Sequence, residues 1–328
     1  GEVVGLVGES GCGKSTLGRM IAGMIPPSEG EIRYEGQTLS DKRDAKSRRQ
    51  RLKLQMIFQD PMSSLNPRMK VEDIVGESAV YHGLIPGAHK REHVAALLEK
   101  VALDPTYASR YPHQFSGGQR QRICIARALA VQPDFLICDE SVAALDVSIQ
   151  AQIINLFHQL REELHLTYLF ISHDLGVIQH LADRVVVMYL GRVVESAPTE
   201  ALFEAPQHPY TQMLLAAEST GRPAPVPEAA PVVASAKELR IWFPIHAGLL
   251  KRTVGHIKAV NSANFEVRAG ETLGIVGESG SGKTTLALAV MRLIASQVDI
   301  DFNNRRISGL SPRDMRPLRR DMQIVFQD

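Results

Sequence analysis

The stretch Gly5-Leu-Val-Gly-Glu-Ser-Gly-Cys-Gly-Lys-Ser-Thr-Leu17 decides how this chain folds. Within it, Gly8 to Ser15 has the pattern G-x-x-x-x-G-K-S and follows an apolar run, Val3 to Val7. Glycines at these positions let backbone N–H groups wrap a phosphate, and the N-terminus of a following helix adds positive potential. A strand, a glycine-rich loop and a helix in this order predict an α/β fold of the P-loop NTPase type.

The polar residues of this loop have separate expected roles. Lys14 should reach the β- and γ-phosphates of a nucleotide, Ser15 should ligate Mg²⁺, and Thr16 should contact the α-phosphate. A plain glycine-rich turn is the alternative, and the flanking strand and helix argue against it. The glycines expected to shape the phosphate site are Gly8, Gly11 and Gly13.

Two acidic residues, Asp139 and Glu140, directly follow the apolar run Phe135 to Cys138. A carboxylate at the end of such a strand points into the crevice where open α/β sheets bind ligands. Asp139 therefore fits a Mg²⁺ ligand, and Glu140 fits a general base or a group that orients the attacking water. Two solvated surface acids remain the alternative.

His173 and Gln59 also follow apolar runs, residues 168–172 and 54–58 respectively. The His173 imidazole can donate to a γ-phosphate oxygen or link Glu140 to the attacking water. The Gln59 amide can sense both Mg²⁺ and that water, so it is a candidate in both roles. Against this, a lone histidine is more often structural.

The motif Ser116-Gly117-Gly118-Gln119 precedes a basic-edged helix that continues through Arg120. Ser116 is a candidate N-cap, and the helix N-terminus beyond it offers free N–H groups to an anion. All four residues are nucleotide-binding candidates, although a simply capped helix start is the alternative. The motif lies over 100 residues from Lys14 and need not serve its own module's nucleotide.

The chain contains an internal repeat. Gly274-Ile-Val-Gly-Glu-Ser-Gly-Ser-Gly-Lys-Thr-Thr-Leu286 repeats the first stretch, and Gln323-Ile-Val-Phe-Gln-Asp328 repeats Gln55-Met-Ile-Phe-Gln-Asp60. Unrelated loops would not share a second element at nearly the same distance, so we expect two copies of one module, with the second loop again between a strand and a helix. The second set of binding candidates, with Thr284 also a metal candidate, is Gly277, Gly280, Gly282, Lys283, Thr284, Thr285 and Gln327.

These copies set the predicted domains: a first module at 1–216, a linker at 217–236 and a second module at 237–328. Nearly alternate prolines between Arg222 and Pro231 favour extended polyproline geometry in the linker. The first copy begins just before its loop strand, and the second ends before another Ser-Gly-Gly-Gln. We therefore expect the chain to be an internal fragment of a longer tandem protein.

Composition narrows the possible classes of protein. With 328 residues and a net charge of +1, the chain carries no global signature of nucleic-acid or anionic-membrane binding. No run of 18 apolar residues predicts a membrane span, and no signal peptide is expected. The three cysteines, Cys12, Cys124 and Cys138, fit neither a metal site nor a disulfide framework and are expected to be reduced thiols.

Taken together, these motifs resemble the nucleotide-binding domain of ABC transporter ATPases. Longer strings are similar to the oligopeptide/dipeptide importer branch, which includes nickel and glutathione importers, and the two modules resemble its fused members. The resemblance implies a RecA-like parallel sheet core, an antiparallel β subdomain and a helical lobe at about residues 60–115. The strings are Phe58-Gln-Asp-Pro-Met-Ser-Ser-Leu-Asn-Pro-Arg68, Ala144-Leu-Asp-Val-Ser-Ile-Gln-Ala-Gln152 and His208-Pro-Tyr-Thr211.

The resemblance also implies a function: an ATPase that uses ATP and Mg²⁺ to drive membrane import of peptides or related small substrates. Its partners would be two transmembrane permease subunits, an extracytoplasmic binding protein acting indirectly, and a second ATPase module, with no nucleic acid. The protein would sit peripherally on the cytoplasmic face of the inner or plasma membrane. ATP would lie between the Lys14 loop of one module and the Ser116 motif of the other.

Some points stay open from the sequence. Trp242 or Phe243 would be the adenine-stacking aromatic of the second copy, or either would be core. Ala143 stands where the family usually has serine, which removes a hydroxyl from the loop after Glu140. A soluble ABC ATPase acting on ribosomes or DNA is the alternative function, and peptides, glutathione and nickel are not distinguished as substrates.

Overall fold

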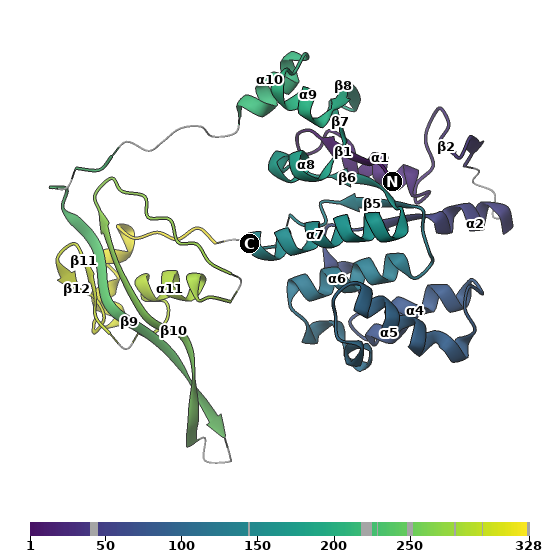
Figure 1. The fold of residues 1–328 in the computed structure, drawn as a ribbon. Helices are drawn as coiled ribbons and strands as arrows, with labels where there is room; N and C mark the ends of the chain where they lie inside the picture. The colour runs from purple at the N-terminus through teal and green to yellow at the C-terminus, as the bar shows by residue number, and fades with distance from the viewer. Residues whose placement is uncertain are drawn as a thin grey trace. The chain divides into compact units, whose positions relative to one another are not determined.

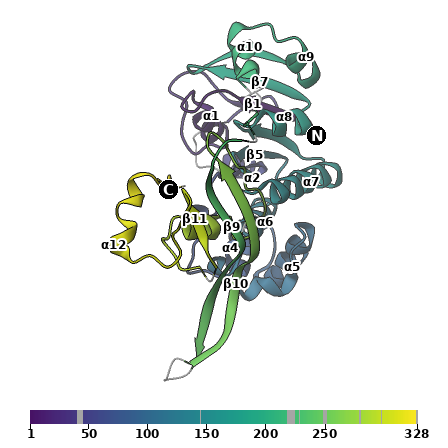
Figure 2. The same cartoon turned by 90° about the vertical axis from the view of Figure 1, so that its left-hand side faces the viewer.

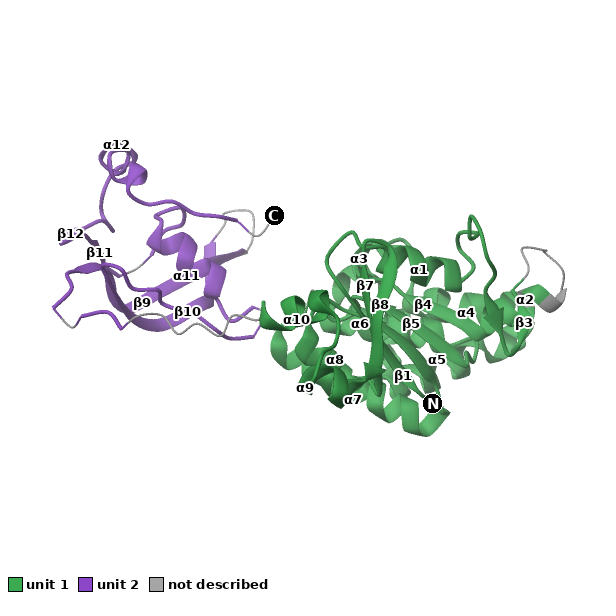
Figure 3. Cartoon of the chain, turned by 90° about the horizontal axis from the view of Figure 1, so that it is seen from above, with its two compact units in different colours: residues 1–220 green, residues 221–328 purple. Residues whose placement is uncertain are grey.

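The computed structural model describes residues 1–39, 45–143, 145–217, 225–227, 229–247, 252–278, 280–296 and 298–326. It divides into two compact units, Gly1–Thr220 and Gly221–Asp328 (Figure 3). The predicted linker at 217–236 lies partly outside the described residues, and the first strand of the second unit begins within it, at Val232. The predicted domain boundaries stay a prediction.

The first unit is built on a six-stranded sheet with the order β4-β5-β6-β1-β7-β8. All neighbouring strands are parallel except the last pair, in which β8 runs antiparallel to β7. The apolar runs identified in the sequence form β1, β4, β5 and β6, and β7 and β8 form a hairpin. The strands are β1 (Val3–Val7), β4 (Leu54–Ile57), β5 (Phe135–Asp139), β6 (Thr167–Ile171), β7 (Arg184–Tyr189) and β8 (Arg192–Pro198).

The central strands are apolar on both faces because helices cover both sides of a parallel sheet. Phe157 of α7 (Val147–Leu164) packs edge-on against Tyr168 and Phe170 of β6, with ring centroids 5.6 Å apart in each pair. The other helices near the strand ends are α1 (Lys14–Ile21), α2 (Ala45–Lys53), α3 (Pro61–Ser64), α8 (Leu175–Leu181), α9 (Thr199–Glu204) and α10 (Pro209–Ala216).

A helical lobe lies at one end of the first unit, opposite α9 and α10 (Figures 1 and 2). Its helices are α4 (Val71–Tyr81), α5 (Lys90–Lys100) and α6 (Gly117–Leu129). Helix α5 lies within the predicted lobe at residues 60–115 and buries Val94, Leu97 and Leu98. A short hairpin, β2 (Arg33–Tyr34) with β3 (Gln37–Thr38), follows α1.

The second unit is an antiparallel sheet with the order β10-β9-β11-β12 and two α-helices among its described residues. Two long strands, β9 (Val232–Ala247) and β10 (Arg252–Arg268), run side by side (Figure 2). Ala236, Leu239 and Ile241 of β9 form a core with Ala289 of α11. The shorter elements are α11 (Lys283–Val290), β11 (Ile300–Phe302), β12 (Arg305–Arg306) and α12 (Pro312–Met315).

One sequence prediction is wrong in this unit. Residues 271–278, which precede the second loop, form no strand. In the first unit β1 lies between β6 and β7, and the described residues of the second unit contain no counterpart of either. Without neighbours to satisfy its backbone, the segment leaves Val276 93% exposed.

Candidate functional site

The phosphate loop of the first unit joins β1 to α1, as the sequence predicts. Gly8, Gly11 and Gly13 all have positive φ, at 148°, 83° and 104°. A Cβ on Gly8 would lie 2.2 Å from the carbonyl oxygen of Met188, so only glycine fits there. The loop geometry is thus fixed by glycine conformation and by close packing on β7.

The Lys14 side chain is folded over this loop. Only 5% of Lys14 is exposed, and its Nζ donates to the carbonyl oxygens of Gly8 at 2.8 Å and Glu9 at 2.9 Å. A buried ammonium held by two carbonyl oxygens and, at 3.9 Å, by the Cys12 sulfur is a strong attractor for an anion, because a charged partner would compensate its desolvation better.

Ser15 and Asp139 meet across the loop. The Ser15 hydroxyl donates to Oδ1 of Asp139 at 2.8 Å, joining the start of α1 to the end of β5. Burial raises the pKa of Asp139, with the Ser15 hydrogen bond opposing this shift and the nearby Glu140 adding to it. A hydroxyl and a carboxylate are hard oxygen ligands of the kind that Mg²⁺ accepts.

Ser15 and Asp139 together offer too few ligands to fill the coordination sphere of Mg²⁺. Among the described residues, no three His, Cys, Asp or Glu side chains group as a metal cluster. A Mg²⁺ ion here would therefore take its remaining ligands from water and from the phosphates of a nucleotide, which is how Mg²⁺ is commonly held beside phosphates.

The three catalytic candidates meet beside Asp139. Gln59 Nε2 donates to Oε2 of Glu140 at 2.7 Å, and His173 Nδ1 lies 3.4 Å from Oε1 of the same carboxylate. They follow β4, β5 and β6, neighbouring parallel strands whose carboxyl ends share one edge of the sheet. Glu140 has φ 45°, an uncommon conformation for a non-glycine residue that recurs at functional sites.

Ser116 caps α6 as predicted. Its hydroxyl accepts from the N–H of Gln119 at 3.3 Å, and the Gln119 side chain accepts from the N–H of Ser116 at 3.0 Å. A Cβ on Gly118 would lie 2.5 Å from the Ile149 side chain of α7, which explains the glycine there, and Gly117 faces Leu145. Among the described residues, no hydrogen bond joins this motif to the phosphate loop.

The second loop keeps its local geometry without the surrounding site. Lys283 Nζ donates to the carbonyl oxygens of Gly277 and Glu278, each at 2.7 Å. Thr284 and Thr285 lie in the first turn of α11, after the N-cap Gly282 at φ 94°. Gly277 and Gly280 also have positive φ, and Gln327 lies outside the described residues.

Trp242 and Phe243, the two candidates for the adenine-stacking aromatic, have different surroundings. Lys258 Nζ lies 4.7 Å from the centroid of the Trp242 ring, so a cation covers one face of this side chain. Phe243, the neighbouring candidate, is 40% exposed.

Two contacts on the first loop were missed by sequence reasoning. The Glu9 N–H donates to the Tyr210 hydroxyl at 3.0 Å, and the Gly191 N–H donates to the Cys12 carbonyl oxygen at 3.1 Å. Tyr210 belongs to the string His208–Thr211, which served only as a family signature, so no local pattern indicated a contact about 200 residues away.

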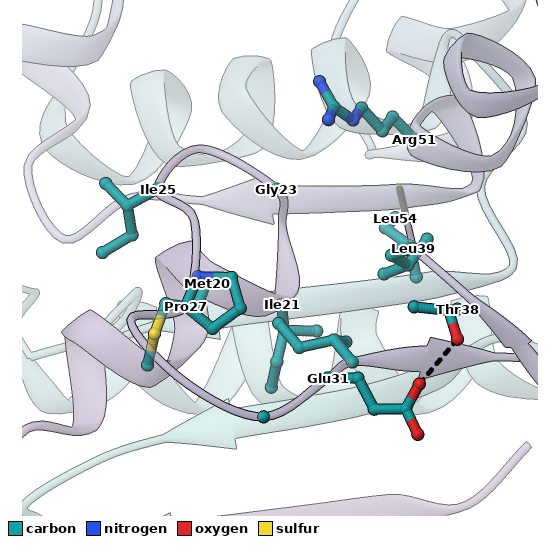
Figure 4. Close-up of a pocket in the computed structure, with 12 residues that line it drawn as sticks. Met20, Ile21, Gly23, Ile25, Pro27, Glu31, Thr38, Leu39, Arg51 and Leu54 are labelled. Atoms are coloured by element: carbon teal, nitrogen blue, oxygen red, sulfur yellow. Dashed lines mark hydrogen bonds between the residues drawn. The ribbon is translucent and has the colours of Figure 1, made fainter. Parts of the chain in front are cut away.

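A cavity of about 230 Å³ lies away from the first unit's site, at the C-terminal end of α1 and the start of β4 (Figure 4). Apolar side chains at the end of α1 and on the following segment line it, and Thr38 donates to Glu31 at 2.7 Å at its edge. None of its lining residues is a predicted site residue. They are Met20, Ile21, Gly23, Ile25, Pro27, Gly30, Glu31, Ile32, Thr38, Leu39, Arg51 and Leu54.

Among the residues that the structure describes, no helix is long and apolar enough to cross a lipid bilayer.

The first unit, with its P-loop, strand-end carboxylates and capped Ser-Gly-Gly-Gln helix, has the fold of an ABC-type P-loop ATPase. The family model described as "ABC transporter" matches residues 1–143 and 260–328. The chain belongs to the ABC transporter family.

Several curated relatives are similar to this chain. It is 46% identical to the peptidoglycan transport ATP-binding protein YejF of Agrobacterium fabrum, over the whole chain and 62% of that protein. It is 40% identical to the glutathione import ATP-binding protein GsiA of Escherichia coli, over the whole chain and 59% of that protein. The oligopeptide transport ATP-binding protein AppF of Bacillus subtilis is 53% identical over 66% of each chain. The chain thus spans less than two thirds of each relative's length.

Solved structures support the fold. CbiO1 from Clostridium perfringens, part of an ABC transporter complex, matches 62% of this chain and 80% of its own with a TM-score of 0.57 and 29% identity. The ATP-binding cassette MJ0796, a dimer in a post-hydrolysis state with ADP and Pi, matches 60% of this chain and 85% of its own with a TM-score of 0.54 and 30% identity.

Proposed function

We propose that the protein is the ATP-binding and hydrolysing component of a membrane importer for peptides or related small substrates. The observation that carries this proposal is the convergence of Lys14, the Ser15–Asp139 pair and the Gln59–Glu140–His173 group at one edge of a parallel sheet. Such an edge is where α/β sheets bind nucleotides.

Each residue of the site has a proposed task. Lys14 leaves the loop carbonyls to neutralise the β- and γ-phosphates, and Thr16 contacts the α-phosphate. Ser15, Asp139 and Gln59 would hold Mg²⁺, which would neutralise charge on the phosphates. Because burial raises the pKa of Asp139, its carboxylate gains from a cation at this position.

Glu140 accepts the proton of the attacking water, the water oxygen bonds to the γ-phosphorus, and ADP leaves with the electrons of the broken P–O bond. Gln59 donates to the Glu140 carboxylate and so restrains its orientation. His173 lies within reach of the same carboxylate and is 60% exposed in its side chain, which leaves it able to turn toward a γ-phosphate oxygen.

The facing half of the site comes from another module. Ser116, Gly117, Gly118 and Gln119 close over the nucleotide bound by a partner's Lys14 loop, through the free N–H groups at the start of α6. The dimeric state of the MJ0796 cassette supports such pairing. The first unit holds both halves, a phosphate loop and a Ser-Gly-Gly-Gln helix, so we infer that two chains pair through their first units.

The second loop extends this arrangement. We infer that Gly277, Gly280, Gly282, Lys283, Thr284, Thr285 and Gln327 bind a second nucleotide in the tandem protein, with Thr284 as its Mg²⁺ ligand. The matching lysine contacts in the two loops support this.

The relatives' names, which cite peptidoglycan transport, oligopeptide transport and glutathione import, support import as the function. The proposed partners are two permease subunits, with an extracytoplasmic binding protein acting through them. The proposed location is the cytoplasmic face of the membrane, without insertion. A soluble ABC ATPase on ribosomes or DNA is disfavoured by the net charge of +1. Co-purification with permease subunits supports import, whereas ribosome or DNA co-sedimentation supports the alternative.

The chemistry is tested with Glu140→Gln beside the wild-type protein. We expect the variant to bind Mg²⁺-ATP with affinity close to wild type and to lose turnover by at least about 100-fold, because only the base is removed. Absence of nucleotide binding by the wild-type protein would contradict the proposed function. Wild-type turnover in the variant would contradict the role of Glu140.

A further inference from the structure

Tyr210, near the C-terminal end of the first unit's sequence, contacts the phosphate loop. It lies in α10, about 200 residues after the loop, and its hydroxyl accepts from the Glu9 N–H at 3.0 Å. Tyr210 is only 6% exposed, and burial raises its pKa, so the phenol stays protonated. A buried hydrogen bond of this kind stabilises the position of a backbone amide.

Tyr210 is itself held firmly. His208 caps α10, its Nδ1 accepting from the Tyr210 N–H at 3.1 Å. Glu195 of β8 accepts from the N–H groups of Gln207 and His208, each at 2.9 Å. The Tyr210 ring lies against Tyr189 of β7, with centroids 4.2 Å apart. Strand β8, the helix cap and the ring pair together fix where the hydroxyl stands.

The Glu9 residue is therefore held on both sides. Its carbonyl oxygen accepts from Lys14, and its N–H donates to Tyr210. The three donors of the Lys14 ammonium are directed at Gly8 O, Glu9 O and, at 3.9 Å, Cys12 Sγ, so a contact with a phosphate must displace at least one of these. The Tyr210 contact uses neither the Lys14 ammonium nor the Ser15 hydroxyl, so a nucleotide that engages these two groups can leave it in place.

We propose that Tyr210 is a positioning residue that keeps the start of the phosphate loop in its binding shape when Lys14 engages the nucleotide. This inference rests on the proposed nucleotide-binding function. By holding the loop beforehand, Tyr210 lowers the ordering cost of binding and so strengthens affinity.

The test compares Tyr210→Phe with Tyr189→Phe in the full chain. Both changes remove one phenol hydroxyl from the same ring pair, but only the first removes a contact to the loop. Fluorescent ATP binding is measured with and without Mg²⁺, together with steady-state turnover and amide hydrogen exchange of a peptide covering residues 5–14.

We expect Tyr210→Phe to raise the Kd for ATP about 3- to 10-fold, the range for one lost hydrogen bond. KM should rise by a similar factor with kcat within about two-fold, and the Glu9 amide should exchange faster in the nucleotide-free protein. Tyr189→Phe should match wild type in each measurement. A general loss of stability would instead slow turnover and speed exchange throughout the unit.

Wild-type ATP affinity and unchanged Glu9 exchange in Tyr210→Phe would overturn this inference and leave the proposed function intact. Failure of the wild-type protein to bind nucleotide would overturn both. If Tyr210→Phe does not fold, Glu195→Gln provides a second variant. It weakens the carboxylate that holds His208, and it should speed Glu9 exchange without altering the hydroxyl.

Discussion

The two units place nearly the same sequence in different structures. Val3–Val7 of the first unit is a central strand, and Val7 is 1% exposed. The equivalent residues 272–276 of the second unit form no strand, and Val276 is 93% exposed. The difference lies in the neighbours, because β6 and β7 flank only the first segment. A strand in a parallel sheet is made by its partners more than by its own propensity.

On the other side of the helix that follows each loop, the second unit is the better packed of the two. In the first unit, Met20 and Ile21 of α1 line the cavity of Figure 4. The equivalent residues of α11, Ala289 and Val290, belong to a core built with β9. The first unit therefore buries the strand before the loop, and the second unit buries the end of the helix after it.

The lysine contacts are shared by both units despite these differences. Each lysine donates to two carbonyl oxygens of its own loop at 2.7 to 2.9 Å. Loop shape is thus a local property of glycines at positive φ. The carboxylate, amide and imidazole of the site are not local, since they arrive on separate strands.

The largest expected effect separates the two loops. Lys14→Ala should weaken ATP binding by at least about 100-fold, since it removes a charge-assisted contact to the phosphates. Lys283→Ala should change binding less than about two-fold in this chain, because its loop lacks a sheet behind it. Equilibrium titration with labelled ATP gives both values. Equal losses in the two variants would contradict the distinction between the units.

A smaller effect is expected for stability. Val7→Ala should cost about 2–3 kcal/mol of unfolding free energy by removing buried methyl groups. Val276→Ala should cost less than about 0.5 kcal/mol, because the side chain is already in water. Urea unfolding followed by circular dichroism measures both. A large cost at Val276 would mean that its segment is paired in solution.

The smallest effect concerns Asp139. Its pKa is raised by burial, so the folded protein keeps the proton at pH values where the unfolded chain has lost it, and stability falls as pH rises through that interval. Above that pH interval, the buried carboxylate lowers the free energy of unfolding by a constant amount. Asp139→Asn should therefore be more stable by about 1 kcal/mol at pH 7 without Mg²⁺.

This gain should shrink as the pH falls through that interval and vanish below about pH 3, where Asp139 is protonated in both the folded and the unfolded state. Thermal unfolding at several pH values follows it. The same variant should lose the Mg²⁺-dependent part of ATP binding. A gain that grew as the pH fell would contradict the assigned cause.

The sequence could predict that the first unit's candidate residues lie together, because they follow strands that parallel packing brings to one edge. Their roles in binding and catalysis stay predictions. Lys14, Ser15, Asp139, Glu140, Gln59 and His173 lie where that rule places them. It failed at residues 271–278 because a strand pattern says nothing about whether neighbours exist. It also missed Tyr210, since a contact across 200 residues through a single hydroxyl leaves no periodic or spacing signal.

The central claim is that the first unit contributes both halves of an ATPase site, shared between two chains. The most direct test is Mg²⁺-ATP hydrolysis over a wide range of protein concentration, with Glu140→Gln as the control. We predict turnover that rises with the square of protein concentration at high dilution and disappears in the variant. Turnover simply proportional to protein at high dilution, or turnover that survives Glu140→Gln, would contradict the account.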